Sequence, residues 1–154
     1  MRFTPEHVLD LRDNEIFVFG SNTEGAHAGG AAYIARTRFG AIDGQPEGVQ
    51  GQSYAIPTLT FVPQDDTPDK LPRVVPVTDA ELEDALDRFL TFAYGHPEYT
   101  FVMTKIGCGI AGWRIEQVGE ILIRVAASFF RGLPTNVVWP REFYEILKDY
   151  GVVD

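Results

Sequence analysis

The apolar residues of this chain form short continuous runs that alternate with stripes of helical spacing. The continuous runs predict strands at 16–19, 53–57, 101–104 and 136–138, with a shorter extended piece at 73–75. The stripes predict helices that begin near Gly30, Thr78, Arg114 and Pro140. Alternating strands and helices predict an α/β fold. We expect a three-layer α/β/α sandwich with a mixed central sheet, formed by residues 1–154 as a single domain.

Several elements carry more specific expectations. The strand at 101–104 should lie inside the sheet and be buried on both faces, because its apolar run is unbroken. The helix that begins near Arg114 is expected to continue to Arg131. Residues 61–72, rich in proline and aspartate, predict a mobile surface loop.

Two glycine-rich loops each follow a predicted strand and precede a predicted helix. The first loop covers residues 20–30 and the second covers residues 105–113. Glycine lets the backbone approach a ligand closely, and the first N–H groups of a helix favour an anion. Both loops should lie at the carboxyl edge of their strands, on the same side of the sheet. They therefore predict a clamp for a phosphate-bearing small molecule, with plain strand-to-helix turns as the alternative.

The composition, with 45% hydrophobic and 23% charged residues, is typical of a globular domain. A formal net charge of −9 argues against broad binding to nucleic-acid backbones, but not against a small anion. The lone cysteine, Cys108, permits no internal disulfide, and the sequence has no long apolar run and no signal-like start. We therefore expect a cytoplasmic protein with no membrane segment. Three scattered histidines give no zinc spacing, so neither a metal nor a cofactor is predicted.

Residues 40–52 contain four glycines and three glutamines and offer little to a core. The segment lies between the first predicted helix and the next strand, which lets it reach the edge of the sheet where the two loops lie. Glutamine amides can recognise a polar ligand without adding charge. Two interpretations stay open for this segment: a flexible connector, or a polypeptide that wraps a ligand.

The sequences of the two loops carry a family resemblance. Phe19-Gly20-Ser21-Asn22 ends a strand, His27-Ala28-Gly29-Gly30-Ala31-Ala32 follows, and Gly107-Cys108-Gly109-Ile110-Ala111-Gly112-Trp113 forms the later loop. In these residues the chain resembles a divergent macrodomain, the fold that binds ADP-ribose and its derivatives. It is similar over nearly its whole length to a group of bacterial and phage macrodomain-like proteins, through residues 44–58 and 104–109.

The resemblance implies a set of ligand-binding residues. Asn22 would contact the distal ribose, Trp113 would pack beside it, and the two loops would hold the diphosphate. Asp10, with Asp13 as second choice, would bond the adenine amino group, although neither has the usual sequence context. The full set is Asp10, Gly20, Ser21, Asn22, Gly25, Ala28, Gly29, Gly30, Lys105, Gly107, Cys108, Gly109, Ile110, Ala111, Gly112 and Trp113.

Cleavage of an ADP-ribosyl bond requires a water molecule to be aimed at the reacting carbon and, in some cases, deprotonated. Asn22, His27 and Glu47 are the catalytic candidates, with a packed or solvent-facing histidine and an exposed glutamate as the alternatives for the last two. Lys105 is expected to pair either with a phosphate or in a salt bridge at the rim of the sheet. For Cys108 we favour a packing role over a nucleophilic one, because no Cys-His-Asn pattern is present.

Two classes of function follow. The first is a protein that binds ADP-ribose or a related nucleotide-derived ligand and hydrolyses an ADP-ribosyl linkage. The second is a module that binds or sequesters a nucleotide signal without chemistry. In either case the expected partner is a small molecule of the ADP-ribose type or an ADP-ribosylated macromolecule.

Overall fold

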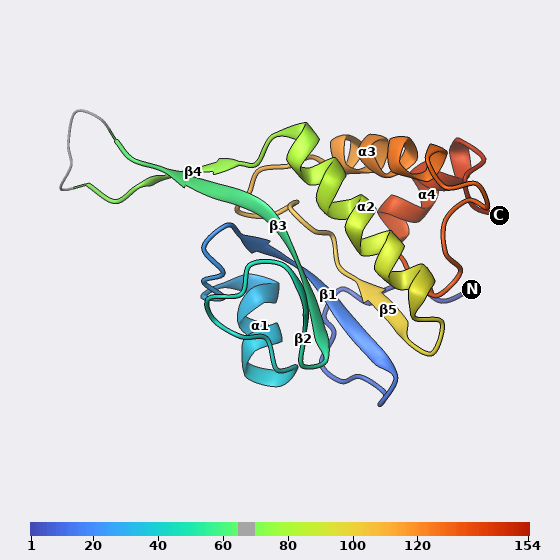
Figure 1. The fold of residues 1–154 in the computed structure, drawn as a ribbon, viewed down its shortest axis with the longest axis horizontal. Coiled ribbons are helices and arrows are strands. Elements are labelled where there is room, and N and C mark those ends of the chain that lie inside the picture. Colours follow the sequence, from blue (N-terminus) through green and yellow to red (C-terminus); the bar gives the residue numbers. More distant parts are fainter. Residues whose placement is uncertain (65–69) are drawn as a thin grey trace.

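The computed structural model describes residues 1–64 and 70–154, which form a mixed sheet flanked by helices (Figure 1). The strands in the described residues are β1 (Glu15–Asn22), β2 (Gly48–Gln50), β3 (Ser53–Val62), β4 (Arg73–Pro76), β5 (Thr100–Met103) and β6 (Val137–Val138). The helices are α1 (Gly30–Arg38), α2 (Asp79–Gly95), α3 (Ile115–Ala127) and α4 (Arg141–Asp149). None of these helices is both long and apolar enough to cross a membrane.

Strand β1 occupies the middle of the sheet, whose order is β2-β3-β1-β5-β6. It pairs in parallel with β3 on one side and with β5 on the other, and β6 is parallel to β5. Strands β2 and β4 both pair antiparallel with β3, so the sheet is mixed as expected. Because β1 and β5 are parallel neighbours, their carboxyl ends meet at one edge of the sheet.

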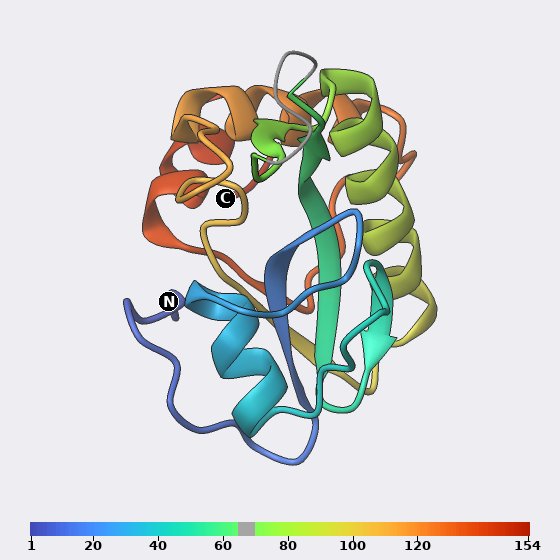
Figure 2. The same ribbon diagram turned by 90° about the vertical axis from the view of Figure 1, so that its left-hand side faces the viewer.

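Alternating side chains of the strands divide the core into two apolar clusters. Phe17 and Phe19 of β1 pack with Ala32 and Ala35 of α1 on one face. Val18 of β1 belongs to the larger cluster on the other face, together with residues of α2, α3 and α4. Figures 1 and 2 show α1 on the opposite side of the sheet from the other three helices. The expected α/β sandwich with a mixed sheet is therefore confirmed.

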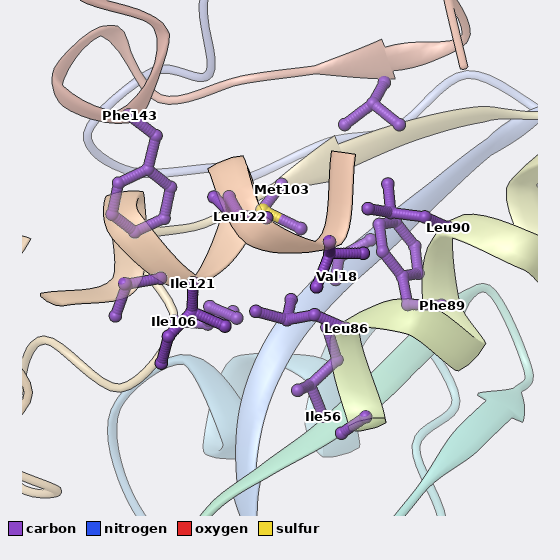
Figure 3. Close-up of a cluster of buried hydrophobic side chains, with 14 of the residues drawn as sticks. Val18, Ile56, Leu86, Phe89, Leu90, Met103, Ile106, Ile121, Leu122 and Phe143 are labelled. Atoms are coloured by element: carbon purple, nitrogen blue, oxygen red, sulfur yellow. The ribbon is translucent and has the colours of Figure 1, made fainter. Parts of the chain in front are cut away.

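The larger cluster is built from fully buried side chains of several elements (Figure 3). Strands contribute Val18, Ile56 and Met103, and helices α2, α3 and α4 surround them with Leu86, Phe89, Leu90, Ile121, Leu122 and Phe143. Phe101, Val102 and Met103 of β5 are all fully buried, and β5 lies between β1 and β6. The prediction of an interior strand at 101–104 is thus confirmed.

Several boundaries differ from those predicted; strand β1, for example, runs from Glu15 to Asn22 and so includes the first residues of the predicted loop at 20–30. Strand β3 extends beyond 57 to Val62 and pairs with β4, forming a hairpin that projects from the body of the molecule (Figure 1). The predicted loop at 61–72 therefore begins inside a strand, and its residues 65–69 lie outside those that the structure describes. Helix α3 ends at Ala127, before Arg131, because the following residues turn back: the Phe129 N–H bonds to Ala126.

The segment at 40–52 is not a flexible connector. It contains β2, which pairs with the start of β3, and its Gln50 is buried. Gln50 Nε2 donates to the carbonyls of Gln45 and Gly48, and Oε1 accepts from the Ile42 N–H at 2.8 Å. One glutamine side chain thus satisfies the backbone of a segment that has few apolar residues.

Glu15 is a buried carboxylate, 3% exposed, at the start of β1. The Arg2 guanidinium and the Arg12 backbone N–H both donate to it. Burial raises the pKa of Glu15, but these hydrogen bonds and the charges of Arg2 and Arg12 outweigh it and hold the pKa below its ordinary value. Ionised Glu15 therefore stabilises the folded state above the ordinary glutamate pKa, and this stabilisation is lost as pH falls towards the lowered value.

We predict that Glu15→Gln lowers the free energy of unfolding at pH 7 by about 1–3 kcal/mol, the usual worth of hydrogen bonds to a charged group. The difference from wild type should shrink as the pH is lowered from 6 to 3. Urea unfolding across this range measures it, with Glu24→Gln at an exposed position as the control. A difference that stays constant with pH would contradict the role of the ionised carboxylate.

Candidate functional site

The two glycine-rich loops converge on a cleft of about 920 Å³ at the carboxyl ends of β1 and β5. This volume lies within the usual range for small-molecule sites. The predicted site residues that line it are Gly20, Ser21, Asn22, Ala28, Gly29, Gly30, Lys105, Gly107, Cys108, Gly109, Ile110 and Ala111. The expectation that both loops lie at the same edge of the sheet is confirmed.

Backbone N–H groups without an internal acceptor gather around this cleft. Within the described residues, Ala28 and Gly29 of the first loop donate no hydrogen bond, and no side chain caps α1, which begins at Gly30. Gly109 and Ile110 of the second loop likewise donate none to the described part of the chain. The first N–H groups of a helix have no partner within the helix itself. The cleft therefore has the donors to hold an anion through its backbone.

Asn22 lines the cleft, but its side chain also organises the first loop. Its Nδ2 donates to the carbonyl of Ala26 at 2.8 Å, and its Oδ1 accepts from the N–H groups of Glu24 and Ala26. An asparagine that bonds the backbone ahead of it is a common turn-former. One N–H of the Asn22 amide remains for a ligand.

The second loop turns sharply at Gly107, whose φ is +76°. A Cβ at this position would lie 2.8 Å from Cδ1 of Trp113, so only glycine fits above that ring. Trp113 is buried beneath the loop and donates from Nε1 to the carbonyl of Thr58 at 2.9 Å. Neither Trp113 nor Gly112 lines the cleft, so the tryptophan supports the loop from below instead of facing a ribose.

Cys108 is half-buried, and its thiol donates to the carbonyl of Ile106 at 3.5 Å. Burial raises the pKa of this thiol to about 11, despite the opposing charge of Lys105. The thiol is therefore protonated at neutral pH, which agrees with a packing role.

His27 is corrected from a catalytic candidate to a core residue. Its side chain is 0% exposed, packs edge-on against Phe19 and does not line the cleft. Its Nε2 lies 3.1 Å from Oε1 of Gln50. That oxygen already accepts from Ile42, so it acts as the acceptor and His27 donates. The other ring nitrogen, Nδ1, has no partner among the described residues.

Glu47, the other acid–base candidate, also lies outside the cleft. It forms an ion pair with Arg88 of α2. The pair is bidentate: Arg88 Nη2 and Nε donate to the two carboxylate oxygens at 2.9 and 2.5 Å. Asp10, the proposed adenine contact, is exposed and outside the cleft, as is the second choice, Asp13. These three carboxylates therefore gain no support as site residues.

Gly25 is a buried residue of the first loop that lies close to residues 44 and 45 and does not line the cleft. Its φ is +71°, and a Cβ there would lie 2.7 Å from the backbone nitrogen of Gln45. Ser21 Oγ donates to the carbonyl of Pro46 in the same segment. In the described structure no residue of 40–52 lines the cleft, so the segment buttresses the loop and does not wrap a ligand.

Lys105 is the one predicted cation at the cleft, and carboxylates already hold it. Its Nζ lies 3.1 Å from Glu142 of α4 and 3.5 Å from Glu6. The hydrogen bond to Glu142 raises the pKa of Lys105, and the pKa of Glu142 is lowered first by a backbone hydrogen bond at the start of α4 and then by the hydrogen bond from Lys105. The salt-bridge interpretation of Lys105 is the one that the structure shows.

Sequence reasoning missed the walls of the cleft. Most of the residues that it did not anticipate come from the N-terminal segment, the hairpin and the start of α4: Thr4, Pro5, Glu6, His7, Val8, Leu9, Thr58, Leu59, Phe61, Val74, Pro140 and Glu142. Phe17, Ile34 and Thr104 line the cleft as well. No local pattern marks them, because they reach the cleft only through tertiary packing. In the ranges 1–64 and 70–154, no group of three or more His, Cys, Asp or Glu side chains is placed to hold a metal ion.

Comparison with known proteins adds little to this geometry. No protein-family model and no curated protein matches the chain. One solved structure that is similar is a protein of unknown function from Bacteroides thetaiotaomicron, 18% identical, with a TM-score of 0.47. The match covers 74% of this chain and 81% of that one. A similarity this distant says nothing about the function of the protein.

We predict that His27→Phe lowers the free energy of unfolding by about 1–3 kcal/mol, because Gln50 loses a buried hydrogen bond while the aromatic packing is kept. The folded variant should bind cleft ligands within about twofold of wild type, since the ring lies outside the cleft. Urea unfolding and calorimetric titration with ADP-ribose measure the two effects. If the variant is as stable as wild type but has lost affinity for ADP-ribose, His27 contributes to ligand binding and the core assignment is wrong.

Proposed function

We propose that the protein is a macrodomain-like module that binds ADP-ribose or a related nucleotide-derived ligand in the cleft between its two glycine-rich loops. The observation that carries this proposal is the set of backbone N–H groups at the cleft, from Ala28 and Gly29 in one loop and from Gly109 and Ile110 in the other, that lack acceptors in the described residues. Donors on both sides of one cleft suit an anion that bridges them, as a diphosphate does.

The side chains of the cleft also favour an ester of phosphate over a free, highly charged anion. Lys105 is neutralised by Glu142 and Glu6, so little positive charge remains to attract a free anion. In contrast, Val8, Leu9, Phe17 and Ile34 give one part of the wall an apolar surface. A ligand with a flat base at one end and a diphosphate in its middle would use both surfaces.

Binding without chemistry is the form of this function that the geometry favours. Of the three catalytic candidates, His27 and Glu47 lie outside the cleft, and Asn22 is engaged within its own loop. Glu6 and Glu142, which do line the cleft, are tied to Lys105. Hydrolysis of an ADP-ribosyl bond would need a base close to the reacting carbon, so turnover is the test that separates the two classes.

Gly29 and Gly109 allow a direct test, because a Cβ at either position meets no protein atom within 4 Å. We predict that Gly29→Val and Gly109→Val fold normally but bind ADP-ribose at least about tenfold more weakly, since each side chain enters space that the ligand needs. Calorimetric titration measures affinity, and thermal unfolding checks the fold.

Gly95→Val is the matched control, since this glycine at the end of α2 is equally unobstructed and lies outside the cleft. It should leave affinity unchanged. Absence of ADP-ribose binding by wild type, or wild-type affinity in both cleft variants, would refute the proposal. Release of ADP-ribose from a modified substrate by wild type would show that the module is instead a hydrolase.

A further inference from the structure

Strand β3 contains a bulge at the point where it contacts both loops. In its pairing with β1, Ser21 faces Pro57 but Asn22 faces Leu59, so Thr58 is an extra residue with no partner in β1. Pro57 has no backbone N–H to give to the sheet, which suits it to an interruption of this kind. Bulges are frequent beside functional sites, where they redirect a residue out of the regular ladder.

The bulged residue uses its freed groups to hold both loops. Thr58 is 2% exposed, and its Oγ1 donates to the carbonyl of Ser21, at the base of the first loop, at 3.1 Å. Its own carbonyl accepts from Nε1 of Trp113, the residue that supports the second loop, at 2.9 Å, and also from the Val77 N–H at 3.1 Å. The Trp113 N–H in turn donates to the carbonyl of Gly107 at 2.9 Å. Hydrogen bonds made by different groups of Thr58 and Trp113 thus link one loop to the other.

The two loops are closely packed around Thr58. A Cβ on Gly20 would lie 3.2 Å from the backbone nitrogen of Gly107 and 3.3 Å from the side chain of Thr58. A Cβ on Gly107 would lie 2.8 Å from Trp113 and 3.4 Å from Cβ of Thr58. The two loops approach each other directly at this point, and Thr58 and Trp113 fill the space beneath them. A shift of either loop would therefore be felt by the other.

We propose that Thr58 is a positioning residue that couples the two loops and fixes the separation of their N–H donors. The inference rests on the proposed function in one respect, namely that a ligand bridges the loops. The hydroxyl holds the first loop and the carbonyl holds the second, so the bulge sets the width of the cleft across which a diphosphate would be gripped. Preorganised donors bind an anion more tightly than donors that must be ordered first.

The test compares Thr58→Val, which keeps the shape but removes the hydroxyl, with Thr58→Ser, which keeps the hydroxyl. Trp113→Phe removes the other hydrogen bond of the chain. Thr60→Val is the control for a hydrogen bond to one loop alone, because the Thr60 side chain, two residues further along β3, bonds the Thr23 hydroxyl of the first loop, has no bond to the second loop and does not line the cleft. Thermal unfolding first establishes that each variant is folded.

Two readouts are then measured. Amide hydrogen exchange of the free protein should quicken in both loops for Thr58→Val, but for Thr60→Val it should quicken at most around Thr23 in the first loop and not in the second loop. Affinity for ADP-ribose should fall up to about tenfold in Thr58→Val, the range of one neutral hydrogen bond, and stay within about twofold in Thr58→Ser. The double variant Thr58→Val/Trp113→Phe should lose less ADP-ribose affinity than the sum of the losses in the two single variants, because both substitutions break the same link between the loops.

Faster exchange confined to β3, or a Thr58→Val affinity equal to that of Thr60→Val, would overturn the coupling. If wild type binds no ADP-ribose but exchange quickens in both loops of Thr58→Val, the coupling stands and the proposed ligand is wrong. If ADP-ribose binds normally to every variant, the ligand assignment stands and the positioning role fails.

Discussion

The parallel pairing of β1 with both β3 and β5 is the constraint on which the rest of the structure depends. It brings the carboxyl ends of neighbouring strands to one edge, so loops that are distant in sequence emerge side by side. It also divides the core, because alternate residues of β1 face α1 on one side and the other three helices on the other. Without this pairing the glycine-rich loops would be two unrelated turns.

Several polar side chains near this cleft support its loops from outside and do not face a ligand. Gln50 organises the segment that packs on the first loop, and His27 and Ser21 connect that loop to it. Trp113 lies under the second loop. The polar side chains that look most reactive in the sequence therefore bond other groups of the protein, as His27 bonds Gln50 and Glu47 bonds Arg88, and hydrogen-bond donors for a ligand come mainly from the main chain of the two loops.

Much of the fold could be predicted from the sequence, because apolar periodicity and glycine position report local structure directly. The strand predicted at 101–104 is β5 at 100–103, and both loops were found, although β1 extends to Asn22 and the first loop begins after it. What could not be predicted is which side of a loop a residue faces: His27 and Gly109 look equally available in the sequence, yet one is fully buried and the other lines the cleft. Strand β2 was missed because its burial depends on one glutamine and not on an apolar run. The N-terminal residues 4–9 could not be assigned to the cleft either, because only tertiary packing brings them to it.

The ion pairs of Lys105 have a consequence for the conditions under which the cleft works. Attraction between a free lysine and an anion is long-ranged and is screened by dissolved salt, whereas amide dipoles act only at contact. With its lysine already paired to Glu142 and Glu6, the cleft has little long-range pull on anions, and the protein as a whole repels them through its charge of −9. Occupancy of the cleft would then depend on the shape and concentration of the ligand, and small free anions such as phosphate would compete poorly with it.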